Sequence, residues 1–578
     1  MLVRPRRALL ATYLRPEWPR AALLGVLLLT GIGLQLANPQ VARTFIDHAQ
    51  SGEPLDRLIW IALLFLGVAF LTQVATIAET YVAENLGWRT TNALRADLTR
   101  HVLDLDASFH TEHTPGELIE RIDGDVSAVA GFFSRFVVEI IGSAIFLIGV
   151  LVLLYREDWR VGAVLTAFAL TAVVFLTRGG GFVAVRARAS REASADLSSY
   201  LEEHLGGLPD LKTSGADAYA LRGLHRRLAA RFHRARSSAM GGAIFNGIVA
   251  VIFALGTGAA LALGTVLHDA GAITLGAVYL IFRYTGMLPQ PLQRLTRHMN
   301  SFQQATGAIV RLRELLATRS GVSDGEGASM PPGPLSVEVD DVVFAYGPEP
   351  VLRGVSCRLA PGEVLGLLGR TGSGKTTISR LLFRMHDPSV GVVRLGGIDI
   401  RRVRLDTLRG RVALVTQDVQ LIGGTLRDNV ALFDRSVSDA RIRGVFADLG
   451  LGAWLDALPD GLDTLLGHGG RGLSAGEAQL VALARVFLKD PGLVVLDEAS
   501  SRLDPATERL LEEAVARLLR DRTGVVIAHR LATVERADVI AVLEDGRVAE
   551  IGRRDELARD PASRFAGLLR AGTGEELA

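Results

Sequence analysis

Residues 364–382, VLGLLGRTGSGKTTISRLL, decide the fold of the C-terminal half of this 578-residue chain. An apolar run precedes G-x-x-x-x-G-K-T at 369–376 and a helix-forming stretch follows, which predicts a strand, a phosphate-binding loop and a helix. Glycine lets backbone N–H groups approach a phosphate, and the helix N-terminus adds a favourable field. We expect Lys375 to reach the β- and γ-phosphates of a nucleotide and Thr376 to hold Mg²⁺. The predicted nucleotide contacts of this loop are Gly369, Arg370, Thr371, Gly372, Ser373, Gly374, Lys375, Thr376 and Thr377.

The segment LVVLDEASSRLD, residues 493–504, indicates the hydrolytic part of the same site. Its four apolar residues predict a buried strand, and Asp497 at the end of that strand is placed to bind Mg²⁺ through water. Glu498 is placed to orient or deprotonate an attacking water. A solvated surface often carries an Asp-Glu pair, but a pair that closes a buried strand downstream of a phosphate-binding loop predicts nucleotide hydrolysis.

Six apolar segments in the first half of the chain predict membrane-spanning helices. Hydrophobic residues make up 49% of the sequence, and its mean hydropathy of +0.29 is high for a soluble protein. A helix of about 20 residues crosses roughly 30 Å of hydrocarbon. The alternative is the buried helices of a large soluble protein, but a stretch such as FVVEIIGSAIFLIGVLVLLY is apolar on every side and favours the membrane. The predicted spans are 21–46, 58–83, 136–155, 158–177, 243–268 and 272–292.

Charge placement predicts how these spans are oriented. The N-terminal stretch 1–20 is rich in Arg and is expected to stay in the cytoplasm. The connections at 84–135 and 178–242 then also lie in the cytoplasm. Both are long and rich in Arg and Glu with helical periodicity. The spans are therefore expected to continue into the cytoplasm as two long intracellular hairpins.

A linker rich in Gly, Pro and Ser, residues 319–334, divides the chain into two domains. Residues 1–318 are predicted to form a membrane all-α six-helix transmembrane domain with long cytoplasmic helical extensions. Short β runs alternate with helices in 335–578, which predicts an α/β nucleotide-binding domain. The net charge of +1 gives no sign of a nucleic-acid partner, the single Cys357 excludes an internal disulfide framework, and no cleavable signal peptide is evident.

Further motifs surround these two segments in a fixed order. They are FAYGPEPVLRGVS (344–356), RVALVTQDVQLIGGTLRDNV (411–430), GLSAGEAQLVALARVFLKDPGLVVLDEAS (472–500), SSRLD (500–504) and GVVIAHRLATVERAD (524–538). With them, nearly the whole chain resembles the ABC transporter superfamily, in the exporter half-transporter arrangement of a membrane domain fused to an ABC-type nucleotide-binding domain.

The resemblance implies roles for individual residues of these motifs. Tyr346 is expected to stack on adenine. Gln417 is expected to contact Mg²⁺ and the attacking water, and His529 to contact the γ-phosphate. Asp504 ends the loop that the family calls the D-loop. The implied catalytic residues are Glu498, His529 and Gln417, and the implied metal ligands are Thr376, Gln417 and Asp497.

The signature motif departs from the family pattern. In this family two nucleotide domains enclose two ATP molecules, each between the phosphate loop of one domain and the signature of the other. The usual L-S-G-G-Q reads Leu473, Ser474, Ala475, Gly476 and Glu477 here. Ser474 and Gly476 still offer a hydroxyl and a backbone N–H to the partner's ATP, whereas Ala475 costs roughly 1 kcal/mol if a positive φ is needed. Glu477 adds a like charge, worth roughly 2 kcal/mol of repulsion at about 8 Å and an effective dielectric of about 20.

Two other departures lie near the signature: His468 stands where the family has Glu, and Arg502 replaces a small residue of the D-loop. The chain's own phosphate loop, Asp497, Glu498 and His529 are intact. We therefore expect a heterodimer in which a second half-transporter supplies a standard signature to this chain's working site. This chain's signature then completes a second site that mainly holds ATP. The alternative is neutral drift in a homodimer.

Several features of the membrane half bear on transport. Short helices near 107–115 and 208–216 are expected to press on nucleotide domains, as the resemblance implies; the alternative is two solvated hairpins. Arg283 lies mid-membrane in the sixth span, where it could face an acidic substrate group or pair with a carboxylate. Pro289 and Pro291 could bend that span. The remaining polar candidates for a substrate path are Glu79 and Glu139.

These observations predict ATP-driven export of an amphipathic or lipophilic substrate (drug, lipid or peptide-like), with ATP and Mg²⁺ as cofactors. The chain is expected to be a multi-pass protein of the bacterial cytoplasmic membrane, with its N-terminus and nucleotide domain in the cytoplasm. The expected partners are a second half-transporter, the lipid bilayer and the small substrate. Two alternatives stay open: an importer built on the exporter fold, for siderophore-like cargo, and an ATP-gated membrane regulator. The six spans argue against a soluble DNA-repair or translation ATPase.

Overall fold

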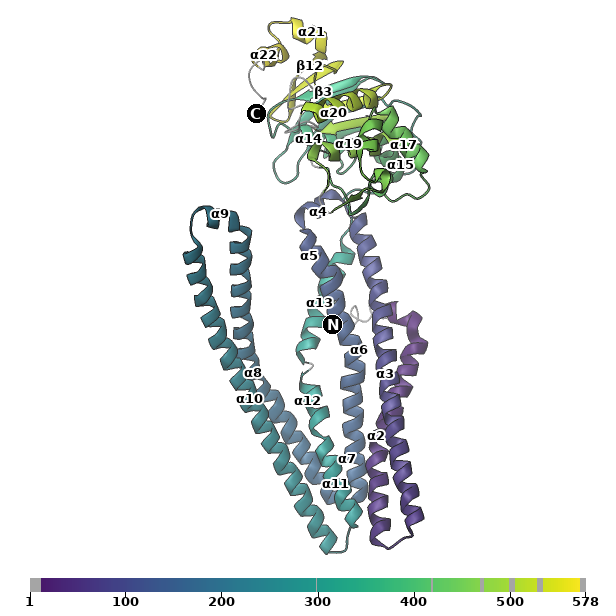
Figure 1. Cartoon of the computed structure of the whole chain (residues 1–578), viewed down its shortest axis with the longest axis vertical. Coiled ribbons are helices and arrows are strands. Elements are labelled where there is room, and N and C mark those ends of the chain that lie inside the picture. The colour runs from purple at the N-terminus through teal and green to yellow at the C-terminus, as the bar shows by residue number, and fades with distance from the viewer. Residues whose placement is uncertain are drawn as a thin grey trace. The chain divides into compact units, whose positions relative to one another are not determined.

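The structure, a computed structural model, describes residues 12–297, 299–416, 419–467, 472–497, 505–527 and 534–571. It divides into two compact units. The first comprises the chain up to Leu103 together with Pro115–Thr318, and the second comprises Asp104–Thr114 together with the chain from Arg319 onward. Figure 1 shows long helices in the first unit and mixed helices and strands in the second.

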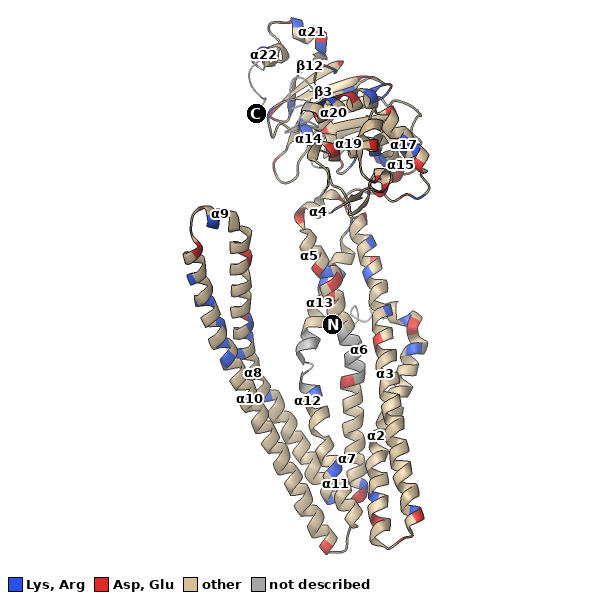
Figure 2. Ribbon diagram, in the orientation of Figure 1, with Lys and Arg blue, Asp and Glu red and all other residues tan. Residues whose placement is uncertain are grey.

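Long apolar helices build the first unit. Residues 237–268 of α10, for example, contain no Asp, Glu, Lys or Arg. In the described ranges, five helices are long and apolar enough to cross a membrane. Charged residues are sparse along the lower parts of α7, α8 and α10 in Figure 2. These five are Thr12–Gln50, Leu55–Asp104, Glu139–Glu157, Trp159–Gly206 and Asp217–Asp269. They contain α2 (Trp18–Gln50), α3 (Leu55–Asp104), α7 (Gly142–Glu157), α8 (Trp159–Gly206) and α10 (Asp217–Asp269), respectively.

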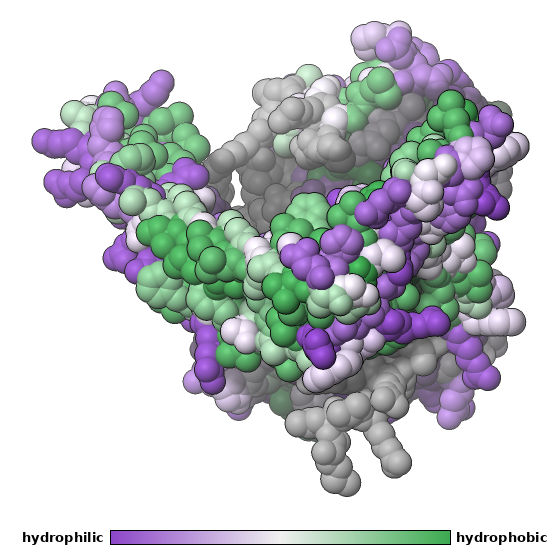
Figure 3. Space-filling view, turned by 90° about the horizontal axis from the view of Figure 1, so that it is seen from below, coloured by the Kyte–Doolittle hydropathy of each residue, from purple (hydrophilic) through white to green (hydrophobic). Residues whose placement is uncertain are grey.

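The outer surface of these helices is apolar. On α3, Trp60, Leu66 and Phe70 expose 72%, 62% and 69% of their surface. Figure 3 shows apolar side chains over much of the outside of the helices, with hydrophilic residues between them. An apolar face of this extent is costly in water and is suited to lipid. The inward faces of α7, α8, α10 and α11 pack into one cluster that includes Val150, Leu165 and Tyr284.

The sixth predicted span is interrupted. Its segment forms α11 (Leu275–Met287) and α12 (Pro289–Arg297), and α13 (Met299–Ala317) follows. Proline has no N–H to donate and crowds the preceding turn, so the break at Leu288 falls where Pro289 predicts it. The hydroxyl of Tyr284 on α11 donates to the backbone oxygen of Leu36 at 2.7 Å, which ties α11 to α2.

Short helices occur in both of the connections that are predicted to lie in the cytoplasm, 84–135 and 178–242. The first segment contains α4 (Ala107–Glu112) and α5 (Pro115–Ile119), followed by the π-helix η2 (Glu120–Asp125), α6 (Val126–Arg135) and the π-helix η3 (Phe136–Ile141). The second segment contains α9 (Leu208–Thr213), which has no buried residue. The helix α4 belongs to the same compact unit as the nucleotide-binding fold.

The second unit is built on two main sheets. In the described part of the chain, an antiparallel sheet has the order β2-β1-β4-β5 and a six-stranded sheet has the order β12-β11-β3-β10-β9-β6. The six-stranded sheet is parallel except for β12. Its central strands β3 and β10 are buried along their whole length, as strands covered on both faces must be. The strands are β1 (Val337–Phe344), β2 (Leu352–Leu359), β3 (Val364–Leu368), β4 (Val390–Leu395), β5 (Ile398–Asp399), β6 (Val412–Val415), β9 (Leu493–Asp497), β10 (Thr523–Ile527), β11 (Val539–Glu544) and β12 (Arg547–Arg553).

Helices surround the six-stranded sheet. Apolar residues of α19 such as Leu480 and Leu483 are fully buried in the same cluster as Val494 of β9 and Phe446 of α17. A short pair, β7 (Gly424–Thr425) and β8 (Leu465–Leu466), lies beside α16. The helices are α14 (Lys375–Leu382), α15 (Leu405–Arg411), α16 (Leu426–Ala431), α17 (Asp439–Asp448), α18 (Gly452–Ala457), α19 (Ala475–Lys489), α20 (Pro505–Leu519), α21 (Arg554–Arg559) and α22 (Arg564–Ala571).

Candidate nucleotide-binding site

The loop between β3 and α14 has the backbone that a phosphate site requires. Gly369, Gly372 and Gly374 have φ angles of +148°, +85° and +104°. A Cβ at Gly369 would lie 2.3 Å from the backbone oxygen of Leu543, and one at Gly374 would lie 2.5 Å from Cδ2 of Leu352. Glycine is therefore needed both for the conformation and for the space.

The polar groups of this loop fit the triphosphate of a nucleotide. The hydroxyl of Ser373 is buried and has no hydrogen-bond partner among the described residues. Lys375 is only 5% exposed, and its Nζ donates to the backbone oxygens of Gly369 and Arg370. No side chain caps α14, because the N-cap residue is Gly374. A buried hydroxyl, an ammonium group and an uncapped helix N-terminus together suit a bound anion.

The other predicted contacts of the loop differ in exposure. Arg370, Thr371 and Thr376 are exposed, whereas Thr377 is buried on α14. An exposed threonine hydroxyl at the second position of α14 is free of the core and can reach a metal ion. Hydroxyl and carboxylate oxygens are the ligands that Mg²⁺ prefers, so Thr376 and Asp497 form a suitable donor set.

Tyr346 lies beside the phosphate loop. Its hydroxyl donates to Oγ1 of Thr377 at 3.4 Å and accepts from Nη1 of Arg380 at 3.1 Å. Its ring meets the ring of Phe344 edge to face, with centroids 4.9 Å apart. The ring is nevertheless 48% exposed. An aromatic residue that is held by its neighbours and still half exposed is suited to stacking on a base.

Strand order brings the predicted hydrolytic residues to the same edge of the sheet. β10 lies between β3 and β9, and Asp497 at the end of β9 pairs in register with Ile527 at the end of β10. The carboxyl ends of parallel strands share one edge, so Asp497 lies two strands from the phosphate loop. Six of the residues named from the sequence lie outside the described residues. They are Gln417, His468, Glu498, Arg502, Asp504 and His529.

The signature forms the N-terminus of α19. Ser474 is the N-cap residue, and its Oγ accepts from the backbone N–H of Glu477 at 3.2 Å. In return, Oε2 of Glu477 accepts from the backbone N–H of Ser474 at 2.7 Å. This reciprocal arrangement is a capping box. The other carboxylate oxygen, Oε1, accepts from Nε1 of Trp454 on α18 at 3.1 Å.

This geometry corrects one expectation and qualifies another. Ala475 is the first residue of α19 and is not among the positive-φ residues of the described chain, so the cost expected from replacing glycine does not arise. Glu477 carries its charge turned back along the helix, where two N–H groups satisfy it. Its carboxylate therefore has partners of its own at the signature, of which the sequence gave no signal for Trp454.

The polar residues proposed for the membrane path lie on separate elements. Glu79 is half-buried on α3, and its Oε2 lies 3.6 Å from the position a Cβ would take at Gly31 of α2. Glu139 is half-buried on η3, and Arg283 is exposed on α11.

Sequence reasoning missed Trp454, His386, Ser108 and Arg380. Trp454, His386 and Arg380 each contact a residue of a quoted motif, and Ser108 contacts His386. Trp454 reaches Glu477, and His386 packs on Tyr346 with ring centroids 5.3 Å apart. The S-x-x-E spacing of Ser474 and Glu477 was the available signal for the capping box.

Together, a phosphate-binding nucleotide fold and long lipid-facing helices on one chain define a membrane-bound ATPase. The ABC transporter transmembrane region model matches residues 22–292, and the ABC transporter model matches residues 352–501. The chain belongs to the ABC transporter family. It is a half-transporter that couples ATP hydrolysis to transport, as a multi-pass protein of the bacterial inner membrane.

Relatives and a solved structure match most of the length of this chain. An ATP-dependent lipid A-core flippase of Thiobacillus denitrificans is 31% identical over 554 residues, which cover 94% of this chain and 94% of the relative. A multidrug efflux ATP-binding/permease protein of Mycobacterium bovis is 32% identical over 537 residues, covering 90% of this chain but 44% of the relative. The structure of a bacterial Atm1-family ABC exporter with ATP bound matches with a TM-score of 0.78 and 26% identity, over 97% of this chain and 99% of that chain. The predicted fold class and the predicted class of ATP-driven exporter are confirmed.

Proposed function

We propose that the chain uses MgATP to export an amphipathic or lipophilic substrate from the bacterial cytoplasm or inner leaflet, as one half of a dimer. The observation that carries this proposal is the phosphate loop. It combines a buried ammonium on Lys375 with a buried Ser373 hydroxyl that has no partner among the described residues, and the same described part of the chain contains five membrane-length apolar helices.

The residues divide the chemistry among them. Backbone N–H groups of the loop and Lys375 hold the β- and γ-phosphates, and Tyr346 stacks on adenine. Thr376, Gln417 and Asp497 hold Mg²⁺, which neutralises charge on the phosphates when it is bound. Glu498 takes a proton from the attacking water, while His529 contacts the γ-phosphate. The strand order supports this assignment because β9 and β10, which precede Glu498 and His529, end beside the loop.

The substrate class follows from the membrane unit and the relatives. The cluster formed by the inward faces of α7, α8, α10 and α11 is built mostly from Leu, Val, Phe and Ala side chains, which suit an apolar cargo. Relatives named for lipid A-core and for multidrug efflux support lipid-like or drug-like molecules. Arg283, with Glu79 and Glu139, would supply polar contacts on the path. A charged residue within a membrane span is costly unless it serves a pathway or a pair.

A second half-transporter completes the machine. The Mycobacterium bovis relative is covered to only 44% by this chain, so it has room for two such units in one polypeptide. The altered signature with His468 and Arg502 favours a different partner chain. The capping box favours self-pairing, because it leaves Ser474 and Gly476 at the N-terminus of an intact helix. Purification from the native membrane distinguishes the two, since a heterodimer brings a second half-transporter with it.

The decisive experiment uses the transporter purified from its native membrane and reconstituted in proteoliposomes. ATP-driven movement of a lipid-like or drug-like probe is measured with the nucleotide domain outside the proteoliposome and, separately, with it inside. Glu498→Gln is the inactive variant. Export predicts movement away from the nucleotide-domain side and no turnover in Glu498→Gln. Persistent ATPase activity in Glu498→Gln would refute the catalytic assignment. Movement in the opposite direction would indicate the importer, and ATPase activity without movement of any probe would indicate the regulator.

A further inference from the structure

The short helix α4 is anchored within the nucleotide unit. Asp106 is its N-cap residue and accepts from the backbone N–H of Phe109 at 3.1 Å. The same carboxylate accepts from the backbone N–H of Gly321 and from the hydroxyl of Ser320. Phe109 is buried, with 8% of its surface exposed. α4 therefore sits in a defined place relative to the segment that enters the nucleotide-binding fold.

His386 connects α4 to the proposed adenine site. It is 6% exposed, and its Nδ1 lies 3.1 Å from Oγ of Ser108 on α4. Its ring lies 5.3 Å from the ring of Tyr346 at an angle of 86°, and 5.3 Å from the ring of Phe344. One imidazole thus touches α4 on one side and the tyrosine on the other.

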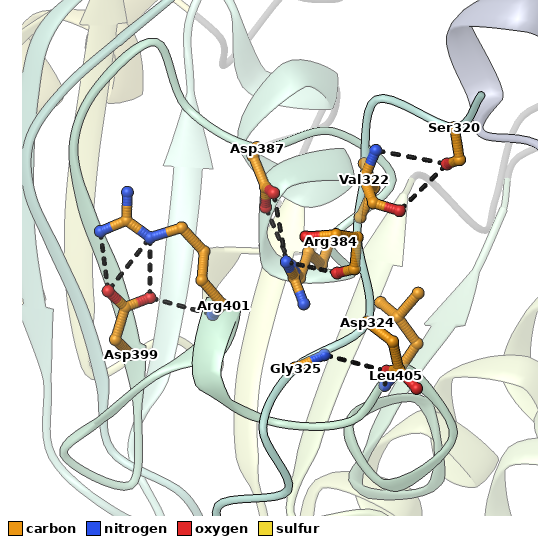
Figure 4. A network of polar contacts seen from close by, with 10 residues as sticks. Ser320, Val322, Asp324, Gly325, Arg384, Asp387, Asp399, Arg401 and Leu405 are labelled. Carbon is orange, nitrogen blue, oxygen red and sulfur yellow. Dashed lines mark hydrogen bonds and ion pairs between the residues drawn. The ribbon is translucent and has the colours of Figure 1, made fainter.

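The segment that carries His386 is held rigidly. Arg384 is 1% exposed, and its Nε donates to Oδ1 of Asp387 at 2.8 Å. Its Nη2 donates to the backbone oxygen of Ser323 at 2.9 Å, which fastens residues 384–387 to the entering segment (Figure 4). These contacts hold the backbone segment on which the imidazole of His386 is mounted.

We propose that His386 is a positioning residue through which α4 sets the orientation of Tyr346, and thereby the affinity of the site for the adenine base. This inference rests on the proposed stacking of Tyr346 on ATP. Arg380 and Thr377 also hold the hydroxyl of Tyr346, and both belong to α14. His386 adds the contact that reports the position of α4.

The charges around the imidazole give this link a dependence on pH. The groups that face it are Arg380 from α14, Asp106 and Ser108 from α4, and Tyr346. Burial lowers the pKa of His386 below its ordinary 6.5, Arg380 lowers that pKa further, and Asp106 opposes the shift. When α4 is docked on His386, the imidazole therefore binds a proton less readily than when α4 is not docked. The contribution of His386 to the docking of α4 is complete above pH 6.5 and is lost as the pH falls from there through the lowered pKa.

The test measures KM for ATP and kcat of the full transporter in lipid nanodiscs. The variants are His386→Ala, His386→Gln, Ser108→Ala, the double variant of Ser108→Ala with His386→Ala, and Tyr346→Ala. Thr111→Ala is the matched control, because Thr111 is exposed on α4 and its hydroxyl donates to the α4 carbonyl of Ala107. We expect His386→Ala and Ser108→Ala each to raise KM by about 3- to 10-fold with little change in kcat, since an aromatic contact of this kind contributes roughly that much.

The pattern across variants decides between explanations. In the double variant the increase in KM should be smaller than the product of the increases in the two single variants, because both substitutions remove the same link between α4 and Tyr346. In the parent KM should rise below pH 6.5, and in His386→Gln it should be flat over the same range. An unchanged KM in Ser108→Ala, or parallel pH profiles in parent and His386→Gln, would overturn the link. An unchanged KM in Tyr346→Ala would instead refute the proposed stacking, so the two failures are distinguishable.

Discussion

Two helices of the nucleotide unit begin at proposed phosphate contacts, and the chain closes their N-termini in opposite ways. α14 follows Gly374, whose φ is +104°, and no side chain caps it. α19 follows Ser474 and carries a full capping box with Glu477. Both helices have the positive end of their dipole at the proposed phosphate contact. One leaves its N–H groups for a ligand, whereas the other has already satisfied two of them with its own side chains.

This difference explains how an acidic residue is compatible with a phosphate contact. The Oγ of Ser474 accepts from the N–H of Glu477, which leaves the hydroxyl hydrogen available to donate to a phosphate oxygen. The carboxylate of Glu477 points back to the N-cap and to Trp454. The acid thus acts first as a structural cap of α19. In the proposed function, its charge would tune, but not abolish, the contact of Ser474 and Gly476 with the partner's ATP.

Removing the cation at the uncapped N-terminus of α14 should have the largest effect on ATPase activity. Lys375→Ala takes the ammonium from the N-terminus of α14, so the β- and γ-phosphates lose their strongest protein partner. We expect ATPase activity to fall by at least about 100-fold, as is usual for loss of one preorganised electrostatic contact. The measurement is steady-state phosphate release.

Arg358→Ala is the control for Lys375→Ala. Arg358 lies on β2 with its side chain 81% exposed and pairs with Glu338. It removes a cation from the same domain and should leave the activity close to that of the parent. Equal losses in the two variants would mean that the open N-terminus has no special role.

The sequence was most informative where one residue type meets a backbone requirement. The glycines of the phosphate loop are spaced for φ angles that other residues resist, so their motif predicts both the loop and its ligand. The long apolar runs likewise predict membrane helices, and Pro289 predicts the interruption of the sixth span. In each case the cause is local and can be read within about 20 residues.

Contacts between distant segments were not predictable in this way. Trp454 and Glu477 are 23 residues apart, and His386 and Ser108 are 278 residues apart. The amino-acid sequence around Trp454 does not distinguish this residue from a tryptophan of the hydrophobic core. The effect of Glu477 was therefore judged from its charge alone, whereas tertiary packing supplies the partners that decide where that charge points.

Removing the negative charge at the capped N-terminus of α19 should have an intermediate effect on the ATPase rate. Glu477→Gln keeps the capping box, because glutamine also accepts from the N-cap N–H. It removes a negative charge near the partner's ATP. We expect the ATPase rate to rise by about threefold, less than the bare repulsion of roughly 2 kcal/mol implies, because two N–H groups already satisfy the carboxylate. An unchanged rate would show that the partner's ATP does not sense the acid and that the signature functions as a standard one.

Glu477→Ala separates charge from capping. It removes the same charge, the cap and the acceptor of the Trp454 N–H, so it should lower the free energy of unfolding of the nucleotide domain by about 2 kcal/mol. Thermal unfolding of the purified transporter measures this loss. Glu477→Gln should show little of it. If both variants unfold alike, the capping box contributes nothing to stability.

The smallest effect on the ATPase rate is expected from replacing Trp454, the donor that holds the acid in place. Trp454→Phe keeps a ring against Phe446 but removes the N–H that Oε1 of Glu477 accepts. Losing a hydrogen bond to a charged group should cost about 1 to 2 kcal/mol of stability. The freed carboxylate should lower the ATPase rate by about twofold, the opposite direction to Glu477→Gln. In the background of Glu477→Gln both effects should shrink, because the neutral amide needs the donor less. Trp159→Phe, at a tryptophan that is 67% exposed in the membrane unit, is the matched control. If Trp454→Phe behaves the same with and without Glu477, Trp454 only fills space, and the capping box alone sets the direction of the acid.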